Sequence, residues 1–223
     1  MLKVIDLVKR RPELSVAEFQ ERWRTEAVPR LAAVPGVRRY VQSHALPQGY
    51  ARGDLLFDGL GEMWFDDEAT CAYALTSAPF AAAMAAMAAV IDPARLVRMP
   101  VDVLVIKDGA IPDNAVKNVE FVNRRPGMPL PPFRAHWQHV HRPIASKIPV
   151  LRRYEQNHLK LFAYATAPAP AYDGLAITWF QSTAHMKAGT QTPEYVITRA
   201  DEPNFLPDGH LPIIITREYE IAD

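Results

Sequence analysis

Residues 9–44 read KRRPELSVAEFQERWRTEAVPRLAAVPGVRRYVQSH, and residues 123–158 read NRRPGMPLPPFRAHWQHVHRPIASKIPVLRRYEQNH. The two stretches align without a gap at an offset of 114, and 12 of the 36 paired positions are identical. Each copy carries Arg-Arg-Pro, a Phe-x-x-x-Trp spacing and Arg-Arg-Tyr. A match of this length, with tryptophans in register, indicates an internal duplication.

The match continues after a one-residue shift, where Asp58-Gly59-Leu60 corresponds to Asp173-Gly174-Leu175. Short apolar or β-branched runs predict four strands in each copy, with helical patterns between them. The resulting β-α-β-β-α-β order is that of a ferredoxin-like unit. The predicted strands are Val4–Val8, Val37–His44, Leu60–Phe65 and Val101–Ile106, then Val119–Val122, Leu151–His158, Leu175–Phe180 and Ile213–Tyr219.

The first helix of each copy follows the Arg-Arg-Pro tripeptide. In copy one, Ser15 is predicted as the N-cap because Glu18 stands at the capping-box spacing. Apolar residues then recur on one helical face, at Phe19, Trp23, Ala27 and Leu31. The second helical region covers Asp67–Ile91, with a break at Pro79, and its counterpart is Thr183–Arg199.

The duplication predicts an α+β protein of two tandem ferredoxin-like domains, residues 1–110 and 111–223. Helices cover only one face of such a four-stranded sheet, so the other face must be buried elsewhere. Two copies in one chain can bury these faces against each other. We therefore expect an intramolecular α/β barrel, as a monomer with an internal pseudo-dimer or as a homodimer.

Composition limits the classes of partner. The 223 residues include 25 Lys and Arg against 25 Asp and Glu, so no basic excess favours nucleic acid or an anionic membrane. The single cysteine excludes a disulfide scaffold and a zinc site built on several thiolates. The N-terminus lacks a signal-peptide pattern, and no apolar run is long enough for a membrane span. We expect a cytoplasmic protein that acts on a small molecule.

Strand alternation predicts a polar and aromatic pocket. We assign the purely apolar face of the first strand, with Ile5 and Leu7, to the helices. The opposite faces should meet between the copies and enclose candidate site residues, since buried polar groups need partners. These candidates are Asp6, Tyr40, Gln42 and His44 in copy one, and Glu120, Tyr154, Gln156 and His158 in copy two. The alternative is a hydrogen-bond network that only fixes how the halves dock.

A histidine cluster, His136-Trp137-Gln138-His139-Val140-His141, distinguishes the second copy. At helical spacing, His141 shares a face with Trp137 and can reach the sheet. His136 and His139 lie three residues apart, as surface histidines or as ligands of one metal ion. A neutral imidazole can accept and return a proton near pH 7, so His141 is a candidate acid/base. Trp137 is either a core residue, as its i,i+4 spacing from Phe133 favours, or a substrate contact.

The sequence resembles the EthD-type domains of the dimeric α/β-barrel superfamily. The resemblance rests on Arg-Arg-Pro, Phe-x-x-x-Trp, a His-x-Pro-like helix end, Arg-Arg-Tyr and the Asp-Gly strand, and it covers two tandem domains. The His-x-Pro position is matched by His141 and Pro143, whereas copy one has Ala27 and Pro29. The resemblance therefore implies one functional pocket, centred on copy two.

The resemblance implies a small, mostly apolar organic substrate. Our first hypothesis is a cofactor-independent enzyme of small-molecule catabolism or secondary metabolism. It would perform acid/base chemistry of dehydratase, isomerase or lyase type on a small apolar or aromatic substrate. His141 is the acid/base, Tyr154 and His158 stabilise an oxyanion, and Asp6 or Glu120 is the supporting carboxylate. The alternatives are a cofactor-free aromatic monooxygenase, a non-catalytic carrier of a hydrophobic metabolite, and a haem protein that uses a pocket histidine.

Overall fold

The structure is a computed structural model that describes residues 1–165 and 167–221, without the side chains of Ala27, Val28 and Ile221. Hydrogen-bonded strand neighbours follow the closed order β1-β3-β2-β8-β5-β7-β6-β4, so the eight strands form a barrel. The predicted α+β class with tandem ferredoxin-like repeats is confirmed. Two compact units are Met1–Val101 with Thr216–Asp223, and Asp102–Ile215. The division predicted at residue 110 stays a prediction.

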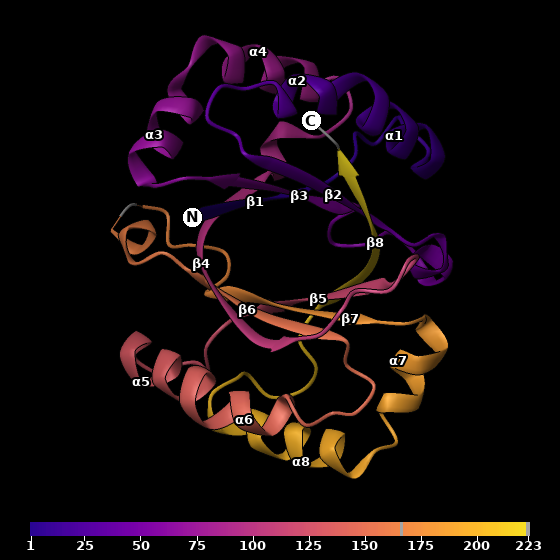
Figure 1. Ribbon diagram of the computed structural model, residues 1–223, viewed down its shortest axis with the longest axis vertical. Helices are drawn as coiled ribbons and strands as arrows, with labels where there is room; N and C mark the ends of the chain where they lie inside the picture. Colours follow the sequence, from indigo (N-terminus) through magenta and orange to yellow (C-terminus); the bar gives the residue numbers. More distant parts are fainter. Residues whose placement is uncertain (166, 222–223) are drawn as a thin grey trace. The chain divides into compact units, whose positions relative to one another are not determined.

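The first unit has the predicted element order, with helices α1 to α4 on one face of its sheet (Figure 1). Its strands pair antiparallel in the order β4-β1-β3-β2-β8. The elements are β1 (Leu2–Val8), α1 (Val16–Arg22), η1 (Trp23–Ala27), α2 (Val28–Ala32), β2 (Arg39–Ala45), η2 (Pro47–Arg52), β3 (Gly59–Phe65), α3 (Glu68–Thr76), α4 (Ala78–Met87), η3 (Pro93–Arg95) and the start of β4 (Val97–Asp108).

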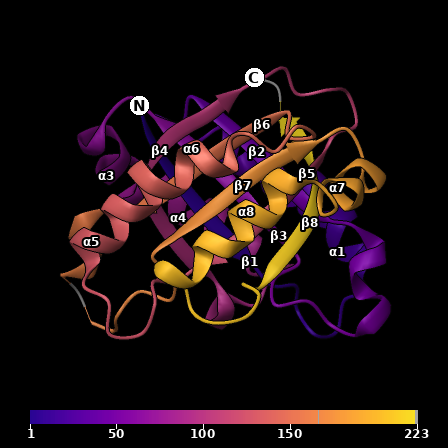
Figure 2. The same cartoon turned by 90° about the horizontal axis from the view of Figure 1, so that it is seen from below.

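The second unit repeats this order, with β7 between β5 and β6 in an antiparallel sheet. Helices α5, α6 and α8 lie over one face of it (Figure 2). The elements are β5 (Val116–Val122), α5 (Leu130–Ala135), η4 (His136–His141), α6 (Arg142–Ala145), β6 (Arg153–Leu159), η5 (Leu161–Tyr164), β7 (Gly174–Phe180), α7 (Thr183–Gly189), α8 (Pro193–Asp201), η6 (Glu202–Asn204) and β8 (Ile213–Ile221), which ends in the first unit.

Local sequence signals account for the helix ends. The Ser15 hydroxyl accepts from the backbone N–H of Glu18, and the Glu18 carboxylate accepts from that of Ser15, so the predicted capping box is present. The second helical region divides at Ser77, whose hydroxyl caps α4, and Pro79 lies in the first turn of that helix. The break is therefore two residues earlier than predicted.

Each first helix contains a π-helical segment that the sequence analysis did not predict. Trp23–Ala27 forms η1 and His136–His141 forms η4. In a π-helix the hydrogen bonds join residues five apart, so the side-chain positions depart from the 3.6-residue period. The periodicity used for the histidine cluster therefore does not hold there.

The predicted assignment of strand faces is wrong. Val4, Val8 and Tyr40 belong to the core cluster that also holds Phe19 and Trp23 of the first helix. The faces with alternating polar residues therefore pack under their own helices. Ile5 and Leu7, predicted under the helices, lie on the other face and are also fully buried. Because both faces of β1 are buried, apolar character does not identify the helix-covered one.

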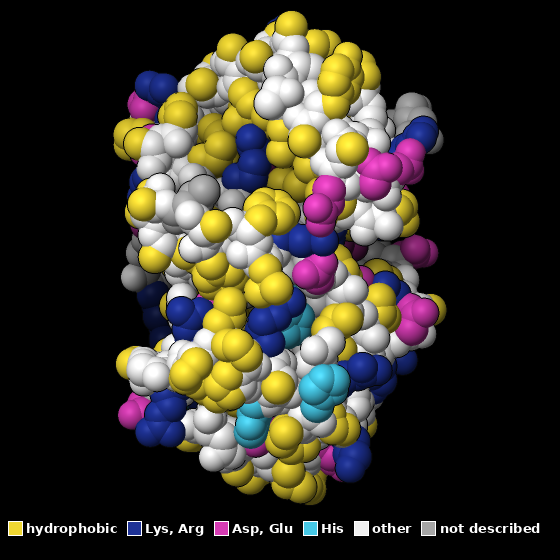
Figure 3. All heavy atoms as spheres, turned by 90° about the vertical axis from the view of Figure 1, so that its left-hand side faces the viewer, with side chains coloured by type: hydrophobic (Ala, Val, Ile, Leu, Met, Phe, Trp, Pro, Cys, Tyr) yellow, Lys and Arg dark blue, Asp and Glu magenta, His cyan; other side chains and the backbone are white. Residues whose placement is uncertain are grey.

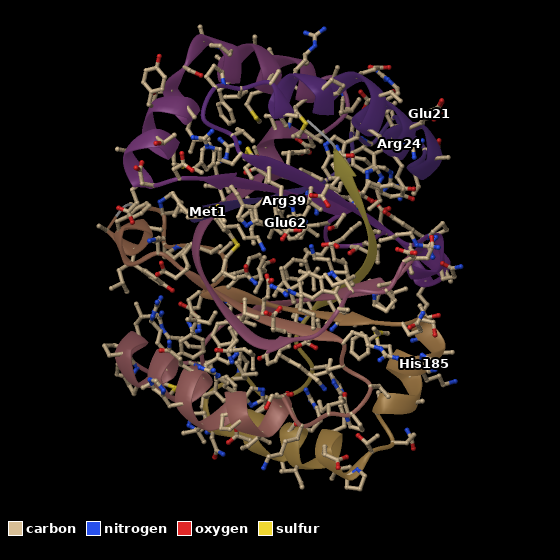
Figure 4. The ribbon with its side chains drawn as sticks, in the orientation of Figure 1. Met1, Glu21, Arg24, Arg39, Glu62 and His185 are labelled. Carbon is tan, nitrogen blue, oxygen red and sulfur yellow. The ribbon has the colours of Figure 1, made fainter. Side chains whose placement is uncertain are left out.

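The face turned away from the helices carries charge in the first unit. Lys3 Nζ lies 2.5 Å from Glu62 Oε1, and both side chains are buried. Figure 4 shows Glu62 and Arg39 on the side of the sheet away from α1 to α4. Ile5 and Leu7, which look purely apolar in the sequence, thus share a strand face with a buried ion pair.

The repeated Asp-Gly pairs allow the helix tryptophans to approach the sheet. A Cβ at Gly59 would lie 2.8 Å from Trp23 Cζ3, and a Cβ at Gly174 would lie 2.8 Å from Trp137 Cζ3. Real Cβ atoms do not approach so closely, so only glycine fits beneath each indole. The side chain of Ala27, predicted on the same helix face, lies outside the described residues.

Within the described residues, no single helix is long and apolar enough to cross a membrane. Helices α3 and α4 meet the length and composition criteria only as a pair, bent by 65° at their junction.

Candidate functional site

A cavity of about 180 Å³ lies within the second unit, between its sheet and its helices. It is lined by residues of β5, β6 and β7 on one side and of η4, α6, α7, α8 and η6 on the other. A cavity of ~150 Å³ lined by apolar side chains holds benzene, so this one accepts a single ring. Its apolar walls include Val122, Ile148, Leu151, Phe180, Phe205 and Leu206.

His141, at the end of η4, lines this cavity and is buried. Its Nδ1 atom lies 2.9 Å from Oδ2 of Asp201, at the end of α8. Among the described residues, no partner is found for Nε2. The carboxylate therefore favours the tautomer with the proton on Nδ1, which leaves Nε2 as a base at the cavity.

Asp201 is the centre of a small hydrogen-bond network. It accepts from Asn204 Nδ2 at 3.1 Å and also contacts His136 Nε2 at 3.0 Å. Burial alone would raise the pKa of Asp201, yet the hydrogen bonds from Asn204, His141 and His136 hold it below the ordinary value. Burial also lowers the pKa of His141, and Asp201 offsets part of that shift. The pair is thus a neutral imidazole beside an ionised carboxylate near pH 7.

The π-helix explains why His136 joins this network. His136 and His141 are five residues apart, and η4 brings both to Asp201. His136 also stacks on Phe205, with ring centroids 4.9 Å apart. The predicted alternative, a metal pair of His136 with His139, does not describe these contacts. Figure 3 shows histidine side chains at the surface of the second unit, where His139 is exposed.

Two carboxyl groups line the same cavity. Glu120 on β5 accepts from Asn118 Nδ2 at 3.1 Å, and Glu202 at the start of η6 is paired with Arg199. Burial raises the pKa of Glu202 to about 7, with a further increase from Glu120 against the opposing effect of Arg199. Burial likewise raises the pKa of Glu120. At neutral pH this part of the cavity holds a proton on its carboxyl groups.

A relay of hydrogen bonds orients the hydroxyl group of Tyr154 on β6. Gln156 Nε2 donates to the Tyr154 oxygen at 3.2 Å and to the Trp137 carbonyl at 2.9 Å. The Trp137 side chain also hydrogen-bonds Tyr154, which together with Gln156 opposes the rise in the pKa of Tyr154 that burial causes. Since the phenol oxygen accepts from two donors, its own proton is available to the cavity that Tyr154 lines.

His158 lies behind this relay and is not among the described residues that line the cavity. Its Nε2 lies 3.2 Å from Gln156 Oε1, and its ring contacts Trp137 at 4.3 Å between centroids. Burial lowers the pKa of His158 to about 3, so the ring is neutral. His158 orients Gln156, and through it Tyr154.

The first unit repeats the hydrogen bonds between His, Gln and Trp, but it has no counterpart of the His141–Asp201 pair. His44 Nε2 lies 2.8 Å from Gln42 Oε1, and Gln42 Nε2 donates to the Trp23 carbonyl at 3.3 Å. Asp6 and Tyr40 lie under the same helices, and Arg98 donates to both carboxylate oxygens of Asp6 at 2.7 Å. The relay therefore supports the π-helix in both copies, whereas a base at the His141 position belongs to the second.

Of the ten predicted site residues, the structure brings four to the cavity: Glu120, Trp137, His141 and Tyr154. Gln156 and His158 lie directly behind them, while Asp6, Tyr40, Gln42 and His44 lie in the first unit. Four residues of the site are not among the site residues predicted from the sequence: Asn118, Arg199, Asp201 and Glu202. The last three follow a weak helical pattern and have no carboxylate or arginine counterpart in copy one that could have marked them.

The repeated Arg-Arg-Pro tripeptides have a structural role. Arg124 donates its backbone N–H at 2.7 Å and its Nη1 at 2.6 Å to Asp173, and the Tyr164 hydroxyl donates to the same carboxylate. Arg10, Asp58 and Tyr50 repeat these contacts in the first unit. The motif therefore fastens the end of the first strand to the Asp-Gly turn, and is more than the solvated turn that we predicted.

The side chains of the site determine whether it can hold a metal ion or exchange protons. Among the described residues, no group of three His, Cys, Asp or Glu side chains is placed to hold a metal ion. His141 and the carboxyl groups Glu120 and Glu202 are the titratable groups of the cavity best placed to exchange protons.

The model of the EthD domain matches this chain twice, over residues 11–94 and 125–208. The chain belongs to the EthD domain family. Each match contains one first helix with its π-helical segment, and the second contains His141, Asp201 and Glu202. The predicted resemblance is confirmed. No curated protein sequence matches the chain.

Solved structures of the same fold cover nearly the whole EthD chain. An anthrone oxidase-like protein has a TM-score of 0.66 at 10% identity, covering 100% of this chain and 94% of its own. A "putative monooxygenase" from Lactobacillus acidophilus NCFM has a TM-score of 0.54 at 11% identity, covering 98% and 92%. A "putative chlorite dismutase" has a TM-score of 0.57 at 12% identity, covering 98% and 94%. At such identities the likeness extends to the fold alone.

Proposed function

We propose that this protein is an enzyme that moves protons on a small, mostly apolar ring compound without a bound cofactor, using the cavity of its second unit. The observation that carries the proposal is the His141–Asp201 pair, which leaves Nε2 of a neutral imidazole at an apolar cavity. A positioned base of this kind contributes about 10²–10⁴-fold to a proton-transfer rate.

His141 removes a proton from a carbon of the substrate. Asp201 holds the ring in one tautomer and stabilises the imidazolium that forms. The lowered pKa of His141 keeps the base unprotonated at neutral pH, so it is ready to react without prior loss of a proton. Asp201 is a positioning residue because it acts through His141.

Tyr154 stabilises the negative charge that develops when the proton leaves. Its oxygen already accepts from Gln156 and Trp137, so its O–H is directed to a substrate oxygen. Donors fixed before the reaction, in a site of low water content, are worth more than the same donors in water. Gln156 and His158 position Tyr154 from behind.

The outcome after proton removal depends on the substrate. Loss of a leaving group gives a lyase or dehydratase, and return of the proton to another carbon gives an isomerase. Reaction of the carbanion with oxygen gives a cofactor-free monooxygenase. Oxygen consumption during turnover identifies the last, and turnover under strict anaerobic conditions excludes it. A Soret band in the purified protein would identify a haem protein in place of all three.

The base is tested with nitrobenzisoxazole, a small ring compound that opens to a coloured cyanophenolate once a base removes the C–H proton of its isoxazole ring. The reaction requires no cofactor and produces a phenolate, which Tyr154 can stabilise. We expect the wild-type protein to accelerate it over buffer, and His141→Ala to lose at least about 100-fold. Exposed His139 provides the matched control, and His139→Ala is expected to keep the rate. Equal rates for wild type and His141→Ala would show that His141 is not the base.

A further inference from the structure

The cavity has a polar side that the base and Tyr154 do not use. Asn118 lines the cavity on β5 and is 6% exposed. Its Nδ2 donates to Glu120, but its Oδ1 is buried without a hydrogen-bond partner among the described residues. A buried acceptor without a partner is unfavourable, so a ligand that brings an O–H or N–H donor gains a hydrogen bond there.

Two carboxyl groups lie on this polar side against a single arginine. Arg199 pairs with Glu202 and donates its Nη2 to the Gly209 carbonyl at 3.0 Å, while Glu120 is held by Asn118. Glu202 also interacts electrostatically with Asp201, Tyr154 and Tyr195. One cation does not compensate two buried carboxylates, so the pair retains a proton, and Glu202 has a pKa of about 7.

In the first unit an arginine pairs with the carboxylate at the equivalent position. Asp6 corresponds to Glu120, and Arg98 on the neighbouring strand neutralises it. In the second unit the Phe121 N–H donates to the Pro212 carbonyl, which places Ile213 opposite Glu120. Ile213 therefore has the position that Arg98 has opposite Asp6. Ile213 lines the cavity and brings no charge to Glu120. The second copy thus has a carboxyl group without the arginine that its counterpart has.

We propose that Asn118, Glu120 and Glu202 form a subsite for a hydroxyl group on an uncharged ring compound. The ligand hydroxyl donates its proton to Asn118 Oδ1 and accepts one from the protonated Glu202, while Glu120 holds the Asn118 amide in place. A carboxylate ligand is repelled by the pair, and a wholly apolar ring leaves Asn118 Oδ1 unpaired. This subsite rests on the proposed function, whose substrate class it names as hydroxylated rings.

The subsite also gives the proposed reaction a leaving group. His141 Nε2 takes a proton from carbon, and the C–H electron pair forms a double bond to the adjacent carbon. The C–O bond breaks as Glu202 protonates the departing hydroxyl, which leaves as water. The imidazolium of His141 and the carboxylate of Glu202 then return to their starting states by proton transfer through solvent. No oxidant or reductant is consumed.

The test compares phenol with toluene, which differ by a hydroxyl in place of a methyl group. Dissociation constants are measured by NMR titration, with benzylamine as a cationic ring. A purely apolar cavity favours toluene, because the phenol hydroxyl would lose its hydrogen bonds to water. We expect phenol to bind the wild-type protein more tightly than toluene or benzylammonium.

Variants assign the preference to residues. We expect Asn118→Leu and Glu202→Met each to reduce the ratio of toluene to phenol dissociation constants by about three- to tenfold. Glu202→Gln keeps a donor and is expected to keep the ratio. Asp208→Asn, which removes an exposed carboxylate of the same unit, is the control and should leave it unchanged. Far-ultraviolet circular dichroism establishes that each variant is folded.

The outcomes separate the two proposals. His141→Ala is expected to slow ring opening of nitrobenzisoxazole by at least about 100-fold and to keep the phenol preference. If phenol fails to bind, or binds the wild-type protein no more tightly than toluene, the subsite is wrong whatever the ring-opening rate. A preference for benzylammonium would show an ionised carboxyl pair and would also overturn it. A phenol preference with unchanged ring opening in His141→Ala would leave the subsite standing and refute the base.

Discussion

The Nδ1 atom of His141 lies 2.9 Å from Oδ2 of Asp201, with one residue at the end of η4 and the other at the end of α8. This contact joins two of the helical segments that cover the second sheet. It also fixes which imidazole nitrogen reaches the cavity. The first copy has Ala27 in place of His141, so the duplication supplied the scaffold and divergence supplied the base.

Replacing Asp201 by Asn tests the dyad. We expect Asp201→Asn to lower the rate of nitrobenzisoxazole ring opening by about 10²-fold or more, because the amide can favour the wrong tautomer of His141. Loss of the carboxylate also removes an interaction that raises the pKa of His141. The acid limb of the pH–rate profile should therefore move to lower pH. A fall in rate with an unmoved acid limb would indicate a structural role only.

Buried neutral histidines predict loss of stability in acid. Burial lowers the pKa of His44 to about 4, with Arg24 adding to the effect, and that of His158 to about 3. An unfolded histidine titrates near 6.5, so between these values the unfolded state binds more protons. The stability is present above pH 6.5 and is lost as pH falls towards 4.

Urea unfolding at several pH values measures this effect. Each histidine contributes a slope of up to about 1.4 kcal/mol per pH unit below pH 6.5. The double variant His44→Asn with His158→Asn is expected to have a lower stability at pH 7.5 and a smaller slope. An unchanged slope in the double variant would mean that other groups cause the acid sensitivity.

Each unit has its own relay of His, Gln and Trp, so the same substitution can be compared in both. Gln156→Leu removes the donor to the Trp137 carbonyl and to Tyr154, and Gln42→Leu removes the equivalent donor to Trp23. Each change also leaves the buried Nε2 of the neighbouring histidine, His158 or His44, without its glutamine partner, and should cost about 1–3 kcal/mol in urea unfolding. Only Gln156→Leu should also reduce phenolate formation, because only Tyr154 lies at the cavity. Equal effects on the rate would contradict the assignment of the site to the second unit.

The fold could be predicted from the sequence because the sequence contains two copies of the same repeat. Trp23 and Trp137, in register, identify the duplication, and the Asp-Gly pairs mark the strand beneath each indole. The candidate site could be predicted only in part. His141 stood out because copy one has Ala27, and Tyr154 because it follows a repeated Arg-Arg pair.

The remaining features depend on long-range packing that no local pattern encodes. Both faces of β1 are buried, so Ile5 and Leu7 gave no information about which face the helices cover. The π-helical segments moved His136 towards Asp201, although its 3.6-residue spacing indicated an exposed face. Asp201 lies 60 residues from His141 and Glu202 lies 82 residues from Glu120, at the end of a helical region with little similarity to its counterpart.

The exchange of one strand residue between the copies tests the origin of the cavity. In the first unit Arg98 donates two hydrogen bonds to buried Asp6, and Ile213 takes the equivalent place beside Glu120. Ile213→Arg is expected to form the missing ion pair, to lower the pKa of Glu120 and to weaken phenol binding at least tenfold, with little change in stability. The reciprocal Arg98→Ile leaves the Asp6 carboxylate buried and unpaired, and should cost about 3–5 kcal/mol in urea unfolding. Phenol binding by Ile213→Arg at the wild-type affinity would show that Glu120 and its neighbours do not form the hydroxyl subsite.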